Sequence, residues 1–157
     1  NDTGTELVER GIELIPGALK EALAALESGN PQWRAQDRAS RTYFHKRSER
    51  DSLIDWTWPA EDLERLVRAL SDPYPAAFTF YRGERIEILA AKVSEIRYGG
   101  TPGRVIVQEG GGAVVSGPLA HRGNNLGLVI TRVRSADGVE HRGDTFFRRG
   151  GYLTGRP

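Results

Sequence analysis

The chain has 157 residues, with 22 Lys and Arg against 21 Asp and Glu, three His, and neither Cys nor Met. The lack of Cys excludes disulfides, thiolate nucleophiles and Cys-ligated metals, and no apolar run is long enough to span a bilayer. This composition is typical of a globular protein, and because no signal peptide precedes the first predicted helix we expect a cytoplasmic location without membrane contact.

Charge is distributed unevenly along the chain. Residues 1–75 hold 10 Lys and Arg against 14 Asp and Glu, a net charge of −4, whereas residues 76–157 hold 12 against 7, a net charge of +5. The basic second half suits an anionic partner. An Arg-rich surface without a specific partner explains the same composition.

The first predicted element is an amphipathic helix within residues 1–30. Thr3 and Glu6 form a capping-box pattern, and Gly29 supplies the stop. Pro16 predicts a kink or break, because an interior proline costs roughly 3 kcal/mol. The apolar residues recur at helical spacing: Leu7, Val8, Ile12, Ile15, Leu19, Leu23 and Leu26. Nothing else in residues 1–30 covers this stripe. This uncovered stripe and the missing Met at position 1 together lead us to expect that the chain is a fragment of a longer protein.

Residues 31–58 are predicted to be a linker that becomes an ordered connector. The stretch from Thr42 to Trp56 mixes cations, acids and aromatics with neither helical nor strand periodicity. Such connectors often carry function. A solvated strap held down by its aromatic residues is the alternative, and we expect Trp56 to be a packing anchor.

The remainder, residues 59–157, predicts a short helix followed by strands. Pro59 is placed for the first turn of the helix, and we expect Arg68 to pair with Glu64 on its surface. From Ala77 onward the apolar period changes to two, with Gly-rich turns between about five strands. The expected fold is therefore α+β, with a small antiparallel barrel or sandwich.

No catalytic or metal constellation is visible. His45, His121 and His141 lack metal-ligand spacing, and no Ser-His-Asp arrangement has suitable flanks. The glycines at 110–112 and 150–151 lack the context of a phosphate loop, so turns are the simpler interpretation.

Several short motifs follow one another in order between Gln36 and Phe80. They are Gln36-Asp37, Thr42-Tyr43, Lys46-Arg47, Asp51, Ile54-Asp55-Trp56, Leu66-Val67-Arg68-Ala69 and Pro73-Tyr74-Pro75-Ala76-Ala77-Phe78. Together they resemble the methionyl-tRNA formyltransferase family. Ala76 stands where the family usually has Gly, and His45 where Pro is common.

This resemblance implies three parts. Residues 1–30 would be the last helix of a missing Rossmann-like formyltransferase domain, residues 31–58 the connector, and residues 59–157 an OB-like barrel domain. It also implies transfer of a formyl group from 10-formyltetrahydrofolate, bound by the upstream domain, to an acceptor amine. The family's catalytic Asn, His and Asp would precede Asn1, so we expect no catalytic residue in this chain and no activity from it alone.

The resemblance also suggests where an acceptor would bind. In the family the connector lies near the mouth of the acceptor site, so Tyr43, Arg47 and Asp51 are candidate substrate-binding residues. Arg47 suits a phosphate or carboxylate. Internal pairing of Asp51 and Asp55 with the neighbouring arginines is the alternative.

A second candidate set lies on the barrel. Arg132 and Arg134 are two apart and share one side of a predicted strand, where Arg104 or Arg122 could complete an anionic-substrate patch. The scarcity of Lys and of aromatic platforms in these strands argues against strong RNA binding. A small acceptor, such as an amino sugar or hydroxyornithine, is consistent with this weak patch and is favoured, and methionyl-tRNA stays open as the other acceptor. A free-standing nucleic-acid-binding module and a structural or dimerising module without a site are the alternatives.

Overall fold

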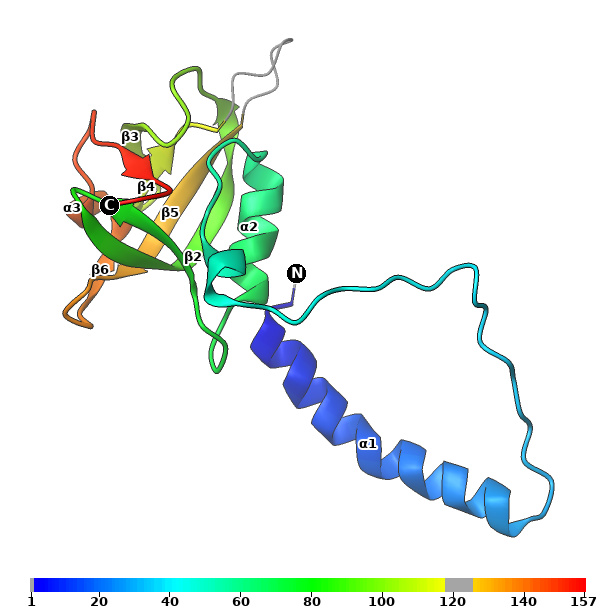
Figure 1. Cartoon of the computed structure of the whole chain (residues 1–157). Coiled ribbons are helices and arrows are strands. Elements are labelled where there is room, and N and C mark those ends of the chain that lie inside the picture. The colour runs from blue at the N-terminus through cyan, green and yellow to red at the C-terminus, as the bar shows by residue number, and fades with distance from the viewer. Residues whose placement is uncertain (1, 118–125) are drawn as a thin grey trace.

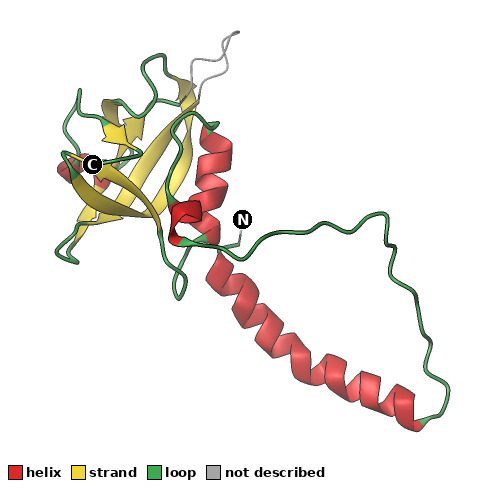
Figure 2. Ribbon diagram, in the orientation of Figure 1, coloured by secondary structure: helices red, strands yellow, loops and turns green. Residues whose placement is uncertain are grey.

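The computed structural model describes residues 2–117 and 126–157 and has the predicted α+β architecture. A long helix projects from a body of sheet and short helices, and an extended strap returns from the tip of the helix to the body (Figure 1; Figure 2). The elements are α1 (Gly4–Glu27), η1 (Glu49–Ser52), α2 (Ala60–Ala69), β1 (Ala77–Tyr81), β2 (Glu84–Arg97), β3 (Val105–Glu109), β4 (Gly112–Val115), β5 (Leu126–Arg134), β6 (Glu140–Arg142), α3 (Gly143–Phe146) and β7 (Leu153–Thr154).

Helix α1 has the predicted start and is exposed beyond its first turns. Thr3 caps it, because its hydroxyl accepts from the Glu6 amide while the Glu6 carboxylate accepts from the Thr3 amide. A kink or break was expected at Pro16, and the break is wrong: the helix is one continuous element, since a proline removes a single hydrogen bond and the turns on both sides retain theirs. No residue of α1 is buried, and its apolar stripe is half exposed or more along most of its length.

The first turn of α1 touches the end of α2. The Thr5 amide donates to Ser71 Oγ at 3.1 Å, and Arg68 Nη1 donates to the Asp2 carbonyl at 2.8 Å. Gly4 lies so close that a Cβ there would stand 2.6 Å from the Ala69 carbonyl oxygen. We call these contacts the α1–α2 junction. They attach the helix to the body at a second point besides the strap.

The strands form one antiparallel sheet in the order β3-β4-β5-β2-β1-β7, with β6 paired to β5. The two ends of this order meet, because Val105 donates to the Gly151 carbonyl and Leu153 to the Gly103 carbonyl, each at 2.8 Å. The sheet thus closes on itself in the OB-like manner expected. The described residues form seven strands where about five were predicted, since β6 and β7 have three and two residues and are too short for an alternating pattern.

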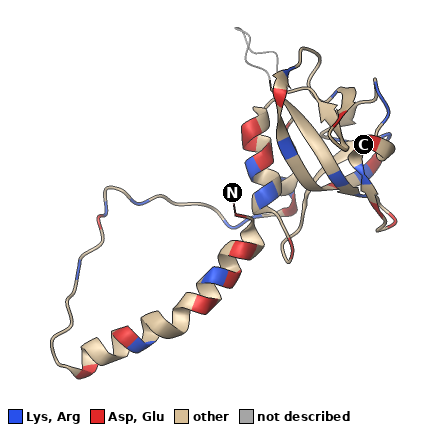
Figure 3. Ribbon diagram, turned by 180° about the vertical axis from the view of Figure 1, so that it is seen from behind, with Lys and Arg blue, Asp and Glu red and all other residues tan. Residues whose placement is uncertain are grey.

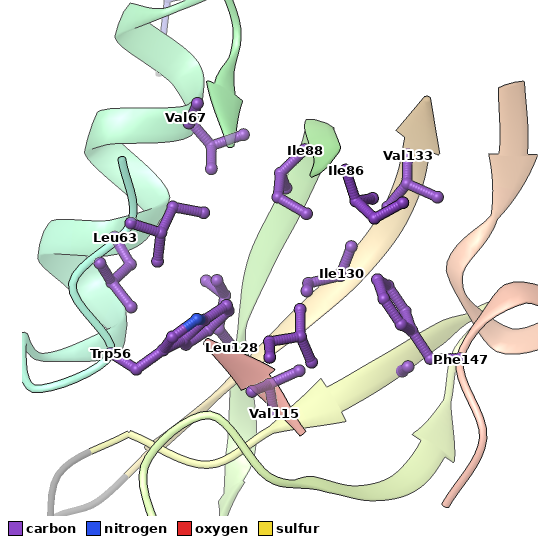
Figure 4. Close-up of a cluster of buried hydrophobic side chains, with 14 of the residues drawn as sticks. Trp56, Leu63, Val67, Ile86, Ile88, Val115, Leu128, Ile130, Val133 and Phe147 are labelled. Atoms are coloured by element: carbon purple, nitrogen blue, oxygen red, sulfur yellow. The ribbon is translucent and has the colours of Figure 1, made fainter. Parts of the chain in front are cut away.

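The core lies between α2, the end of the connector and the inner face of the sheet. Leu63 and Val67 of α2 point at Ile88 and Leu128, and Trp56 lies across the same space (Figure 4). Trp56 is 5% exposed, so it is the packing anchor expected. The hydrophobic core therefore includes side chains from within the predicted connector.

Candidate functional site

The connector turns back on itself around Asp51. Its carboxylate accepts from the Ser48 amide at 2.6 Å and the Ser48 hydroxyl at 2.8 Å, capping η1, and lies 3.2 Å from His45 Nε2. These hydrogen bonds lower the pKa of Asp51 from 3.8 to about 2, the Ser48 amide contributing most. Arg47 Nη2 donates to the Asp51 carbonyl at 3.2 Å. Arg47 and Asp51 are thus brought together in a local turn.

Tyr43 stands apart from this turn. Its ring is 79% exposed and its partner is Arg41, whose guanidinium lies 5.3 Å from the ring centroid. The neighbouring Phe44 is 88% exposed. Two adjacent exposed aromatics on an extended segment are free to contact a partner surface.

The predicted barrel pair, Arg132 and Arg134, lies on one face of β5, where both reach Glu140. Arg134 contacts Glu140 at 3.0 Å and Glu87 at 3.2 Å, whereas the more exposed Arg132 is 3.9 Å from Glu140. The hydrogen bond that Arg134 donates to the Glu140 carboxylate is the main reason that the pKa of Arg134 is raised. The positive charge of this pair is largely offset by its acidic neighbours.

These contacts continue towards the connector. Glu87 is 3.8 Å from Arg85, and Arg85 pairs with Glu49 at the start of η1. The surface from η1 to β6 is thus a chain of alternating charges: Glu49, Arg85, Glu87, Arg134, Glu140 and Arg132. Its charges sum to zero, so it is a weak anion site. Figure 3 likewise shows both signs interleaved on α1 and α2. Arg104 lies elsewhere, over Tyr152 at 5.4 Å, and Arg122 is outside the described residues.

A cavity of about 990 Å³ opens beside the C-terminal end of the chain. We call it the C-terminal cavity. It is lined by residues of four segments: the connector end, the β1–β2 turn, Pro102, and residues 152–157. Its basic residues are Arg50, Arg82 and Arg156, and its exposed aromatic residue is Tyr152.

The three arginines of the C-terminal cavity make no ion pair with any described residue. The lining includes one acid, Asp55, and its carboxylate already accepts from the Thr57 amide at 2.9 Å and the Thr57 hydroxyl at 2.7 Å. The cavity is therefore more cationic than the predicted barrel patch. Sequence reasoning missed it because its arginines are separated by 32 and 74 positions (82 − 50 and 156 − 82) and converge only in the fold.

Two classes of site are not found in the described part of the chain. Residues 2–117 and 126–157 hold no cluster of His, Asp or Glu that could bind a metal ion. No helix among them is long and apolar enough to cross a membrane.

Comparison with known proteins agrees with this arrangement. Residues 46–150 match the family model described as formyl transferase, C-terminal domain. Methionyl-tRNA formyltransferase of Pseudomonas putida F1 is 40% identical over 115 residues, covering 73% of this chain and 36% of that protein.

A second relative aligns over more of the chain. Methionyl-tRNA formyltransferase of Pseudomonas fluorescens SBW25 is 38% identical over 137 residues, covering 87% of this chain and 40% of that protein. The chain thus spans two fifths or less of the length of these curated relatives. By the family match and these identities, the chain belongs to the methionyl-tRNA formyltransferase-like family and carries its C-terminal domain.

Proposed function

We propose that this chain is the C-terminal part of a formyltransferase that uses 10-formyltetrahydrofolate as donor and an amine as acceptor. The observation that carries this proposal is the match of residues 46–150 to the formyl transferase C-terminal domain. The donor and the catalytic Asn, His and Asp belong to an upstream Rossmann-like domain. In the reaction the acceptor amine attacks the formyl carbon, the bond from that carbon to the folate nitrogen breaks, and a proton leaves the amine.

The role of residues 1–30 follows from the exposed face of α1. Eight large apolar side chains of this helix are at least 40% exposed, and residues 2–117 and 126–157 leave even Leu7 and Val8, which lie near the end of α2, only partly covered. Such a stripe in a globular protein packs against another layer. We therefore assign α1 to the upstream catalytic domain, the strap to the connector, and the α1–α2 junction to the boundary between the two domains.

We propose methionyl-tRNA as the acceptor, because the relatives are methionyl-tRNA formyltransferases. The connector residues Tyr43, Arg47 and Asp51 would lie at the acceptor side, with Asp51 holding the turn that presents Arg47. A small acceptor amine is the second candidate. The charges around Arg132 and Arg134 favour this second candidate. Acidic neighbours offset these arginines, so the surface attracts a polyanion only weakly.

The test is a formyl-transfer assay on the protein extended upstream to its initiator Met. Acceptors would be methionyl-tRNA, a nucleotide-linked amino sugar and hydroxyornithine, with residues 1–157 alone as the inactive control. Turnover with methionyl-tRNA supports the first acceptor, and turnover with a small amine alone supports the second. Failure to bind 10-formyltetrahydrofolate would contradict the whole proposal.

A further inference from the structure

The strap does not by itself hold α1 in place. Residues 32–50 are exposed, and in the described chain every hydrogen bond made by residues 30–44 joins residues two or three positions apart. Residues 30–46 could reach up to about 60 Å when fully extended. A tether of that reach allows many orientations of the helix, so the orientation of α1 depends on the α1–α2 junction.

Arg68 is the most connected side chain of the junction, which joins the end of α2 to the point where α1 leaves the body (Figure 1). Its Nε donates to Glu64 Oε1 at 3.0 Å and its Nη2 donates to Glu64 Oε2 at 3.4 Å. This two-point pair fixes the plane of the guanidinium group. The remaining Nη1 donates to the Asp2 carbonyl at 2.8 Å. Arg68 therefore connects α2 directly to the residue before the cap of α1.

A second group of contacts holds the first turn of α1. The first amide groups of a helix have no partner within it. Here the Thr5 amide donates to Ser71 Oγ at 3.1 Å, and the Thr5 hydroxyl bonds both Ser71 Oγ, at 2.9 Å, and the Asp72 carbonyl. Carbonyl groups after α2 thus face the positive end of the α1 dipole, which is a favourable arrangement. The close approach of Gly4 to the Ala69 carbonyl leaves little room for α1 to shift.

The length of α1 magnifies any change at the junction. The helix has 24 residues and is therefore about 36 Å long. A tilt of about 5° at the junction would move its far end by about 3 Å. Productive geometry in an active site tolerates displacements of only about 0.5 Å, and a misplacement of about 1 Å can lower a rate about 100-fold. A domain packed along α1 thus needs an intact junction to stay in register with the barrel body.

We propose that Arg68 and Ser71 are positioning residues for formyl transfer, because they hold α1 at the angle that places the donor-bearing upstream domain opposite the connector turn around Asp51. That turn is fixed to the same body, since the Ile54 amide donates to the Phe78 carbonyl at 2.8 Å. Donor and acceptor sides are therefore both referred to the barrel. The role rests on the proposed function, and the two residues act through α1 without touching donor or acceptor.

The double variant Arg68→Gln/Ser71→Ala tests this role in two measurements. In residues 1–157, the distance distribution between spin labels at Ala24→Cys and Val139→Cys should broaden, because the first turn of α1 loses its partners. In the upstream-extended protein, kcat/KM for the acceptor should fall ~10-fold or more. The affinity for 10-formyltetrahydrofolate should stay within ~2-fold, because the donor is bound within the upstream domain.

Arg65→Gln is the matched control on the same helix. Its guanidinium pairs with Asp62, one turn away, and among the described residues it makes no hydrogen bond to α1. The label distance should be unchanged and kcat/KM should stay within ~2-fold. Both variants should unfold at nearly the parent urea concentration, because Arg68 and Ser71 lie at the surface and not in the core. A general loss of stability is thereby separated from a loss of positioning.

The possible failures are distinguishable. An extended protein that transfers no formyl group to any acceptor overturns the proposed function and, with it, the role in transfer, even where the label distance shows that the junction orients α1. With transfer established, an unchanged label distance or an unchanged kcat/KM in the double variant overturns the positioning role alone. A fall in kcat/KM that comes with an equal loss of folate affinity, or that Arg65→Gln reproduces, overturns it as well.

Discussion

Trp56 Nε1 donates a hydrogen bond to Thr79 Oγ1 at 3.0 Å, at a point where both side chains are buried. Thr79 Oγ1 donates in turn to the Thr154 carbonyl at 3.0 Å. Three segments far apart in sequence are therefore joined in one relay: the connector end, β1 and β7. The relay explains how the connector is fastened to the barrel.

Trp56→Phe tests this relay. The N–H donor is lost together with the pyrrole part of the indole, which leaves a cavity in the core, so we expect a loss of ~2–3 kcal/mol in the free energy of unfolding. Urea unfolding followed by circular dichroism measures it. Trp33→Phe is the control. Because Trp33 is 83% exposed, this substitution should leave the free energy of unfolding unchanged. Equal stability of the two variants would show that the hydrogen-bond relay does not stabilise the fold.

The α1–α2 junction should respond to a methyl group at Gly4. A Cβ there would meet the backbone oxygen of Ala69, which cannot move aside as a flexible side chain would, so Gly4→Ala should displace α1. Gly11→Ala has open space and should only strengthen the helix, by up to ~1 kcal/mol. The readout is the distance between spin labels at Ala24→Cys and Val139→Cys in this Cys-free chain. An unchanged distance in Gly4→Ala would show that the junction does not orient α1.

Polar substitution of the apolar stripe of α1 should lower the stability of the protein only when the upstream domain is present. Leu19→Gln and Leu23→Gln change side chains that are at least half exposed, so residues 1–157 should keep their stability. The upstream-extended protein should lose stability, because the stripe is buried there in our assignment. Leu63→Ala, in the core at 0% exposure, should cost ~2–5 kcal/mol in both forms. A neutral result in the extended protein would contradict the assignment of α1 to the catalytic domain.

Removing the acids of the charge chain should create an anion site. In Glu87→Gln/Glu140→Gln, Arg134 loses both of its ion-pair partners, so binding to heparin should strengthen and its salt dependence should steepen by roughly 1–2 in log–log slope. Glu61→Gln/Glu95→Gln makes the same charge change at acids with no ion pair to the described residues. Equal gains in both variants would mean that net charge alone, and not the release of Arg134, governs binding.

The low pKa of Asp51 sets the pH range in which the η1 turn loses stability. The pKa is depressed in the folded state to about 2 from 3.8, so the carboxylate stabilises the turn above pH 3.8 and loses that contribution as the pH falls towards 2. The carboxyl carbon shift of Asp51 and the amide shift of Ser48 should therefore titrate together, mainly below pH 3. Ser48→Ala should move the Asp51 midpoint upward, and an unchanged midpoint would show that Ser48 does not hold the carboxylate.

Several features followed from local sequence alone. The capping pattern at Thr3 and Glu6, the pairing of Arg68 with Glu64, and the strands from Ala77 onward are set by short-range spacing and hydrogen bonding, and all three occur in the structure. The short motifs between Gln36 and Phe80 carried the family resemblance, which the family match bears out. The candidate site residues Tyr43, Arg47, Asp51, Arg132 and Arg134 remain predictions of substrate contact.

Tertiary structure decided what no local pattern contains. Closure of the sheet through Val105 and Gly151 brings β3 beside the C-terminal segment, and this closure assembles the C-terminal cavity from arginines far apart in sequence. The pairing of β5 with β2 and β6 places Glu87 and Glu140 against Arg134, which offsets the charge that the strand pattern had predicted to be free. The sequence by itself determined the longer elements and the family, because these depend on near neighbours along the chain. Long-range strand pairing determines which charges meet, so only the fold decides it.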